Sequence, residues 1–269
     1  MTENACDCHI HIYDLTRFAL AESATFTPLP ATWQEYEKIQ SALGISRSLI
    51  VQPTGYGFDN RCTLDALRQA GDRARAIVVI PPDIGDTELV ALDKAGVCGV
   101  RFMMVPGSGG MLQWDMLVTM AKRIAAFGWN INLQLDGRDL PLHEAMLHDL
   151  PCKLVIDHNG KFLEPVNTDH PAARSLLRLL EGGNCWVKLA APYETSKIGA
   201  PHYDDVSVLA KMFAKAYPDR CLWASNWPHP NRNPAPDNMA LLALLKKWAP
   251  SDEIRHKILV TNPAHLYRF

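Results

Sequence analysis

Asp7-Cys8-His9-Ile10-His11-Ile12-Tyr13-Asp14 is the stretch that decides the fold, because it shows how the first strand ends. A strand is predicted over residues 5–11, and it runs into two histidines rather than into a glycine-rich turn. In a doubly wound open sheet, the first strand normally leads into a glycine-rich loop that binds phosphate. A (β/α)₈ barrel has no such requirement and carries its functional side chains at the strand ends. The stretch therefore favours a barrel, with the open sheet as the second choice.

Short apolar runs like this one recur along the whole chain, at residues 48–52, 76–80, 97–102, 131–135, 153–156, 185–189 and 221–225. Nearly continuous apolar runs are typical of parallel strands that are buried on both faces. Stretches with helical periodicity separate them, for example residues 114–127 and 204–217. About eight strand–helix units in 269 residues predict an α/β protein with a (β/α)₈ TIM barrel, forming a single domain over residues 1–269.

The composition excludes several classes of protein. Hydrophobic residues make up 48% and charged residues 21%, which is typical of a globular chain. The 27 basic and 29 acidic residues leave no basic excess, so we expect no nucleic-acid partner. No apolar run approaches the roughly 18 residues of a membrane span. The N-terminus lacks the features of a signal peptide, and the seven cysteines are scattered. These features predict a reduced, cytoplasmic chain.

Polar residues cluster where the predicted strands end. Because active sites of such barrels lie at the carboxyl ends of the strands, these residues form the candidate site. They are His9, His11, Gln52, Tyr56, Arg101, Gln134, Asp157, His158, Lys188, Tyr193, Glu194, Asn226 and His229.

Three of these histidines raise the question of a metal. His9 and His11 are two positions apart and so face the same side of one strand, and His158 follows another strand. Zinc accepts such ligands. However, Asn226 is an uncharged amide, and Arg101 directs a permanent cation toward the same cavity. We therefore expect no metal and no other cofactor.

At this point the chain resembles a family. His9-x-His11, His158 and the turn of residues 225–229 (Ser-Asn-Trp-Pro-His) resemble the amidohydrolase superfamily. More narrowly, the chain is similar to the branch that contains 2-pyrone-4,6-dicarboxylate hydrolase and D-galactarolactone isomerase. Segments such as residues 99–102 and 157–162 extend the resemblance along nearly the entire chain. The resemblance implies a distorted barrel and metal-free chemistry on a small carboxylated lactone, in the catabolism of carbohydrate acids or aromatic compounds.

The resemblance also implies roles for individual residues. His9, His11 and His158 would surround the reacting carbonyl, and Arg101 and Lys161 would hold substrate carboxylate or hydroxyl groups. The remaining strand-end residues expected to bind substrate are Gln52, Tyr56, Gln134, Tyr193 and His229.

Asn226 is where the chain departs from most of the superfamily, which has at this position an aspartate that activates water. An amide cannot take a proton from water. Two routes follow: hydrolysis with a histidine as base, ranked slightly first, or isomerisation, in which a substrate hydroxyl attacks the carbonyl. An engineered asparagine that traps substrate would be a third explanation. Met103-Met-Val-Pro-Gly107 also lacks the further basic residues of the hydrolase branch, which disfavours a doubly anionic substrate.

Two other classes of function stay open from the sequence. A metal-dependent amidohydrolase or decarboxylase would require metal at the histidines, so metal analysis distinguishes it. A non-catalytic protein that binds sugar acids would need no cluster of three histidines, and turnover of any lactone would exclude it.

Overall fold

The computed structural model describes residues 3–269, and its centre is one sheet of eight parallel strands in the order β1 to β8. This confirms the predicted α/β barrel; only the ends of several strands differ from the prediction. The strands are β1 (Cys6–Ile10), β2 (Arg47–Val51), β3 (Ala74–Val78), β4 (Val97–Met103), β5 (Asn130–Gln134), β6 (Lys153–Ile156), β7 (Cys185–Leu189) and β8 (Cys221–Trp223).

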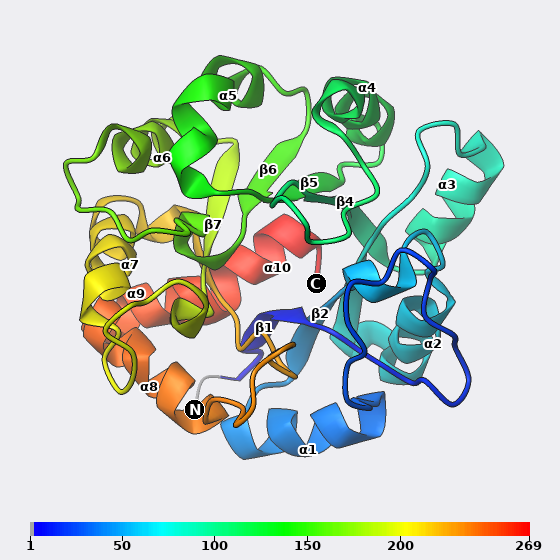
Figure 1. Cartoon of the computed structure of the whole chain (residues 1–269), viewed down its shortest axis with the longest axis horizontal. Helices are drawn as coiled ribbons and strands as arrows, with labels where there is room; N and C mark the ends of the chain where they lie inside the picture. Colours follow the sequence, from blue (N-terminus) through cyan, green and yellow to red (C-terminus); the bar gives the residue numbers. More distant parts are fainter. Residues whose placement is uncertain (1–2) are drawn as a thin grey trace.

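Helices surround the sheet (Figure 1). Most of them connect one strand to the next, as the alternating sequence pattern requires. They are α1 (Trp33–Leu43), α2 (Arg61–Ala70), α3 (Asp86–Lys94), α4 (Trp114–Ala125), α5 (Leu140–His148), α6 (Pro171–Glu181), α7 (Asp204–Ala216), α8 (Asn238–Trp248), α9 (Asp252–His256) and α10 (Asn262–Tyr267). None of the helices over residues 3–269 has both the length and the apolar character needed to cross a membrane.

The last helix, α10, closes the end of the barrel where the strands begin. In Figure 1 it lies near the centre of the ring of helices. Its Tyr267 is fully buried and packs in the same apolar cluster as Cys6 and Cys98 inside the barrel. Asn262 Nδ2 donates to the carbonyl oxygen of Cys221, at the start of β8 (2.8 Å). With that end filled, the carboxyl ends of the strands are left for a ligand.

The seam between β1 and β8 is distorted, because β8 has only three residues. The Asp7 side chain links β1 to the end of β8 where backbone pairing between the two strands is missing. Its carboxylate accepts hydrogen bonds from the backbone N–H (2.9 Å) and the hydroxyl of Ser225. Farther along, Asn226 N–H donates to the His9 carbonyl (3.0 Å) and His11 N–H donates to the Trp227 carbonyl (2.8 Å). The seam thus brings the histidines of β1 beside Asn226, which is more than 200 residues away in the sequence.

Candidate active site

A cavity of about 230 Å³ opens at the carboxyl ends of the strands. Its floor is polar, and its rim comes from the loops that follow β1, β4 and β8. The lining residues are His11, Tyr13, Thr25, Phe26, Pro53, Thr54, Arg101, Met103, Val105, Gly107, Ser108, Gln134, His158, Lys161, Glu194, Asn226, Pro230 and Asn231.

His9 of β1 and His11, which directly follows β1, form a hydrogen-bonded row whose proton positions are set by the groups at its two ends. His11 Nδ1 lies 2.7 Å from the Val51 carbonyl oxygen, which can only accept, so this nitrogen carries the proton. Burial lowers the pKa of His11 to about 3, so the ring is neutral and its Nε2 accepts from His9 Nε2 (3.2 Å). His9 Nδ1 is then bare and accepts from Lys188 Nζ (3.0 Å).

Lys188 is the fully buried centre of a small charged cluster below the cavity. Its ammonium lies 3.1 Å from Asp157 Oδ1 and also donates to Asn132 Oδ1. Asn132 Nδ2 in turn donates to Asp157 Oδ2 (2.8 Å). Burial opposes ionisation of Asp157, but Lys188 and then His9 hold the pKa of the carboxyl well below its usual value. Lys188 and Asp157 therefore form a buried ion pair behind His9.

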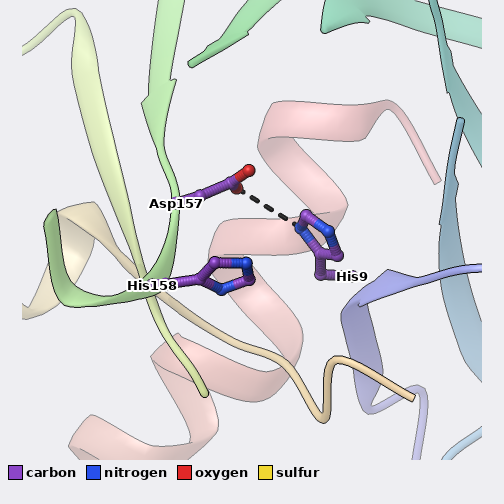
Figure 2. A group of neighbouring side chains, drawn as sticks. All are labelled: His9, Asp157 and His158. Atoms are coloured by element: carbon purple, nitrogen blue, oxygen red, sulfur yellow. Dashed lines mark ion pairs between the residues drawn. The ribbon is translucent and has the colours of Figure 1, made fainter. Parts of the chain in front are cut away.

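Among residues 3–269, one group of side chains has the composition of a metal site: His9, Asp157 and His158, whose ligand atoms lie within 4.8 Å of one another. Figure 2 shows the three side chains pointing toward one another; the dashed line joins His9 Nδ1 and Asp157 Oδ1, which lie 3.3 Å apart. The Lys188 ammonium, however, lies against the ligand atoms of both residues. A dication would meet a fixed positive charge there, so the residues as arranged do not fit a metal.

His158 lies in a turn with unusual backbone geometry. His158, Asn159, Gly160 and Lys161 all have positive φ, at 53°, 56°, 88° and 44°. Residues other than glycine rarely adopt such angles, and such backbone geometry clusters at functional sites. The turn brings both His158 and Lys161 to the cavity wall. The His158 ring makes no hydrogen bond to any described residue, its Nδ1 is buried, and burial lowers its pKa to about 4.

Lys161 is paired with Glu194, which also lines the cavity. Burial alone would raise the pKa of Glu194, but Lys161 and His158 lower it to about 2, so the carboxylate is ionised. Asn226 Nδ2 donates to Glu194 Oε1 (3.1 Å) and to the Tyr193 hydroxyl (2.9 Å). The Asn226 amide is thereby fixed, and its buried Oδ1 has no partner within residues 3–269.

Arg101 is the one buried cation of the described cavity wall that has no carboxylate partner. It is only 4% exposed. Nη1 donates to the Gln52 carbonyl (2.8 Å) and Nη2 to Gln134 Oε1 (2.9 Å), while Nε has no partner in the described chain. Burial lowers the pKa of the guanidinium. A buried charge without a counter-charge is costly, so Arg101 marks the place for an anionic group of a ligand.

The structure brings six of the residues that received a role from the sequence to the cavity wall: His11, Arg101, Gln134, His158, Lys161 and Asn226. His9 lies behind His11 and reaches the cavity only through it. Tyr193 and His229 do not line the cavity and are connected to it through Asn226. Asn226 donates to the Tyr193 hydroxyl, which in turn donates to His229 Nδ1 (2.8 Å).

Gln52 and Tyr56 are not among the lining residues. The Gln52 side chain turns into the loop after β2, where its Nε2 donates to the Asp59 carbonyl (2.9 Å) and its Oε1 accepts from Thr63. The Tyr56 hydroxyl accepts from the backbone N–H of Asp14 (3.1 Å). Gln52 contributes to the site through its backbone carbonyl, which binds Arg101.

Several residues of the site received no role from the sequence. Glu194, Asp157 and Lys188 were noted at strand ends but received no role. Tyr13 could have been found, because it continues the spacing of two residues from His9 through His11. The lining residues of the loops, such as Thr25, Phe26 and Ser108, carry no signal in the sequence that distinguishes them from other loop residues.

The buried histidines predict a stability that falls in mild acid. Burial lowers the folded-state pKa of His158 and of His229 to about 4, and that of His11 further. Unfolded histidines have a pKa of about 6.5, so the unfolded chain binds more protons between these values. Burial raises the pKa of Asp7 to about 6, so protonation of this carboxyl stabilises the folded state as the pH falls. Asp7 is a single group, and its effect is smaller than that of the three histidines together. We expect the free energy of unfolding to drop by about 2 kcal/mol or more from pH 7 to pH 5.

Urea denaturation at pH 7, 6 and 5 measures this effect. Replacing His158 with glutamine should flatten the pH dependence, whereas replacing the exposed His202 should leave it unchanged. A stability that is constant or rises toward pH 5 would contradict the neutral state of the buried rings.

Comparison with known proteins places the chain among described families. The sequence profile of the Amidohydrolase family matches residues 6–269. The chain is 33% identical to 2-pyrone-4,6-dicarboxylate hydrolase of Comamonas testosteroni, over 98% of the chain and 90% of that protein. It is 34% identical to D-galactarolactone isomerase of Agrobacterium fabrum, over 98% and 91%. A crystal structure of an Agrobacterium tumefaciens protein superposes with a TM-score of 0.93 at 32% identity, covering 100% of this chain and 97% of the other.

Proposed function

The chain belongs to the amidohydrolase family, and from that premise we propose that it is a metal-independent enzyme that opens the ring of a lactone carrying one carboxylate. Both relatives are named for cyclic esters, one for a 2-pyrone and one for a sugar-acid lactone. The observation that carries the proposal is Arg101, a buried cation at the cavity wall with no counter-charge in the described chain.

The charges of the cavity wall support a substrate with a single negative charge. Glu194 neutralises Lys161, and burial keeps His11 and His158 uncharged at neutral pH. Arg101 is thus the one uncompensated charge among the described lining residues. A lactone of a sugar diacid has one free carboxylate, because the other is part of the ring. A 4,6-dicarboxylate has two, and the second would face Glu194.

The polar groups among the remaining lining residues suit a polyhydroxylated ring. Tyr13, Thr54, Ser108 and Gln134 offer neutral donors and acceptors around the cavity. The buried Oδ1 of Asn226 lacks a donor among residues 3–269, and a substrate hydroxyl would supply one. We therefore assign the substrate to the lactones of sugar acids.

We place isomerisation first among the reactions that this site can catalyse. A substrate hydroxyl attacks the lactone carbonyl, a new ester C–O bond forms, and the original ring C–O bond breaks. The proton of the attacking hydroxyl ends on the released ring oxygen, so the reaction consumes no water. His158, a neutral ring without a partner in the described chain, can accept this proton and return it. Intramolecular attack needs less activation than attack by water, which suits a site with an amide at position 226.

Hydrolysis is the second candidate, and the same free imidazole favours it. His158 would then accept a proton from water instead of from the substrate. Its pKa of about 4 makes it a weak base, because burial disfavours the charged ring. Attack by free water also needs more activation than attack by a substrate hydroxyl held beside the carbonyl, which is the reason for placing hydrolysis after isomerisation.

A turnover screen tests the proposal. Monocarboxylated sugar-acid lactones and the dianionic 2-pyrone-4,6-dicarboxylate are each incubated with the protein and followed by NMR. A rearranged lactone supports isomerisation, and an open-chain acid supports hydrolysis. Turnover of the dianion in preference to every monoanion would overturn the charge argument, and turnover of no lactone would overturn the proposed function.

Activity is expected to be independent of divalent metals. Lys188 occupies the ligand atoms of His9 and Asp157, which leaves no suitable group for a dication among residues 3–269. After dialysis against EDTA, the initial rate should change by less than about two-fold, and elemental analysis should find far less than one equivalent of zinc or manganese. Stoichiometric metal together with loss of activity on chelation would reject this expectation.

A further inference from the structure

We propose that the Lys188 ammonium takes the place of a divalent metal: it lies where His9 and Asp157 would bind a metal, and it sets which nitrogen of His9 carries the proton. Removing it should convert His9, Asp157 and His158 into a zinc site. The inference deepens the proposed metal-independent chemistry by naming the residue responsible. It concerns metal binding and proton positions, so it can be tested without any substrate.

The distances around Lys188 support this exchange of one cation for another. His9 Nδ1 and Asp157 Oδ1 lie 3.3 Å apart. Two ligands of a tetrahedral zinc, each about 2.0–2.1 Å from the metal, are separated by about 3.3–3.4 Å. The Lys188 nitrogen lies 3.0 Å from the first atom and 3.1 Å from the second. It therefore faces the same two lone pairs that a zinc ion would use.

The third ligand is also in place. His158 offers a nitrogen within 4.8 Å of the ligand atoms of His9 and Asp157, and its ring centre lies 4.9 Å from that of His9. The ring makes no hydrogen bond within residues 3–269 that would have to break before it turned toward a metal. All three side chains are buried, which protects such a site from competing water.

Lys188 also fixes which nitrogen of His9 carries the proton. An ammonium can only donate, so His9 Nδ1 must be bare where it meets Lys188. A carbonyl can only accept, so His11 Nδ1 must be protonated where it meets Val51. With both ends set, the contact between the two Nε2 atoms has one donor, His9, and one acceptor, His11. Lys188 does not line the cavity, and we assign it a positioning role.

The experiment compares the parent with Lys188→Ala, which removes the cation and leaves space for a metal. Each protein is incubated with ZnCl₂, desalted and analysed for zinc, and its melting temperature is measured with and without ZnCl₂. Lys188→Ala should retain about one equivalent of zinc and gain about 5 °C or more, while the parent retains almost none and does not shift. Lys153→Ala is the matched control, because Lys153 lies at the start of the neighbouring strand β6 and is not among the hydrogen-bond or ion-pair partners of His9 and Asp157.

A folded Lys188→Ala protein that binds no more zinc than the parent would overturn the proposal, and so would a parent that retains one equivalent. If the variant folds only when zinc is added, the proposal is supported, because zinc then stabilises the fold in place of the lysine. If it does not fold even with zinc, the parent itself decides the question. ¹⁵N NMR of its histidines should show His9 protonated at Nε2 and His11 at Nδ1; the reverse assignment contradicts the ordering role of Lys188.

Discussion

Asn226→Asp is expected to add a hydrolytic activity that the parent lacks, faster by about 10²–10⁴ than any background ring opening, because a carboxylate can act as the general base that an amide cannot. The new carboxylate would lie at the cavity wall, in the position of Asn226 Oδ1, which has no partner within the described chain. NMR of the products measures the ratio of open-chain acid to rearranged lactone. In the parent the rearranged lactone should dominate; in the variant the acid should.

The surroundings of Asn226 explain why the new carboxylate should be an effective base. Asn226 Nδ2 now donates to Glu194 Oε1 over 3.1 Å, and the substitution would replace this hydrogen bond by two carboxylates in contact. Two like charges so close raise the pKa of one of them. A base is most effective when its pKa approaches the working pH, so the repulsion should favour catalysis. The rate of hydrolysis should accordingly rise with pH through the raised pKa.

Asn231→Asp is the matched control for this change. Asn231 also lines the cavity, but it is exposed, whereas the buried Asn226 donates to Glu194. The same added charge at the rim should change neither the products nor the pH profile. If the parent already hydrolyses its lactone with His158 as base, Asn226→Asp should mainly alter the pH profile. Equal rates, products and pH dependence for Asn226→Asp and the parent would remove Asn226 from the mechanism.

The fold was predictable because burial on both faces leaves a simple pattern in the sequence. Parallel strands covered by helices outside and side chains inside must be apolar nearly throughout, and residues such as Leu154–Ile156 of β6 show this directly. The barrel then determines where the strand ends lie. For this reason His11, Arg101 and Asn226 could be assigned to one cavity from sequence positions that are far apart.

Side-chain direction beyond a strand end was not predictable, because it depends on turns with unusual backbone angles. Gln52 and Tyr56 follow β2, but their polar atoms satisfy backbone groups of nearby loops rather than the cavity. Conversely, Glu194 reaches the cavity from a turn that begins with Ala191 at a φ of 46°. Its pairing with Lys161 requires a second left-handed turn, after β6. No periodicity in the sequence encodes either geometry.

Lys188 shows what a lone charge in an apolar strand can signal. Its strand reads Cys-Trp-Val-Lys-Leu, and a lysine there must be buried with a counter-charge. The sequence alone could not identify the partners, because Asp157, Asn132 and His9 come from the end of β6, from β5 and from β1, respectively. The cluster thus appears only when the barrel is closed.

Arg101→Met should weaken binding of a monocarboxylated lactone by about 2–5 kcal/mol, which corresponds to a dissociation constant about 30- to 4,000-fold higher. The guanidinium is 4% exposed, so its interaction with a carboxylate is screened little by water. Calorimetric titration of the parent and the variant with a slowly converted lactone measures the difference. The corresponding uncharged lactone or amide should bind both proteins nearly equally, because only the charged contact is lost.

The melting temperature of Arg101→Met distinguishes a loss of substrate binding from a loss of folding. Arg101 has no counter-charge among residues 3–269, so the parent bears the cost of a buried, unpaired cation. Methionine removes that cost while filling similar volume, so Arg101→Met should melt at the same temperature as the parent or higher. Arg123→Met is the control: Arg123 also donates to two carbonyl oxygens, of Pro82 and Ile84, but lies outside the cavity. The Arg123→Met protein should be less stable than the parent but should bind the lactone with the same affinity. An Arg101→Met protein that is less stable and binds the lactone as well as the parent does would show that Arg101 supports the fold rather than the substrate.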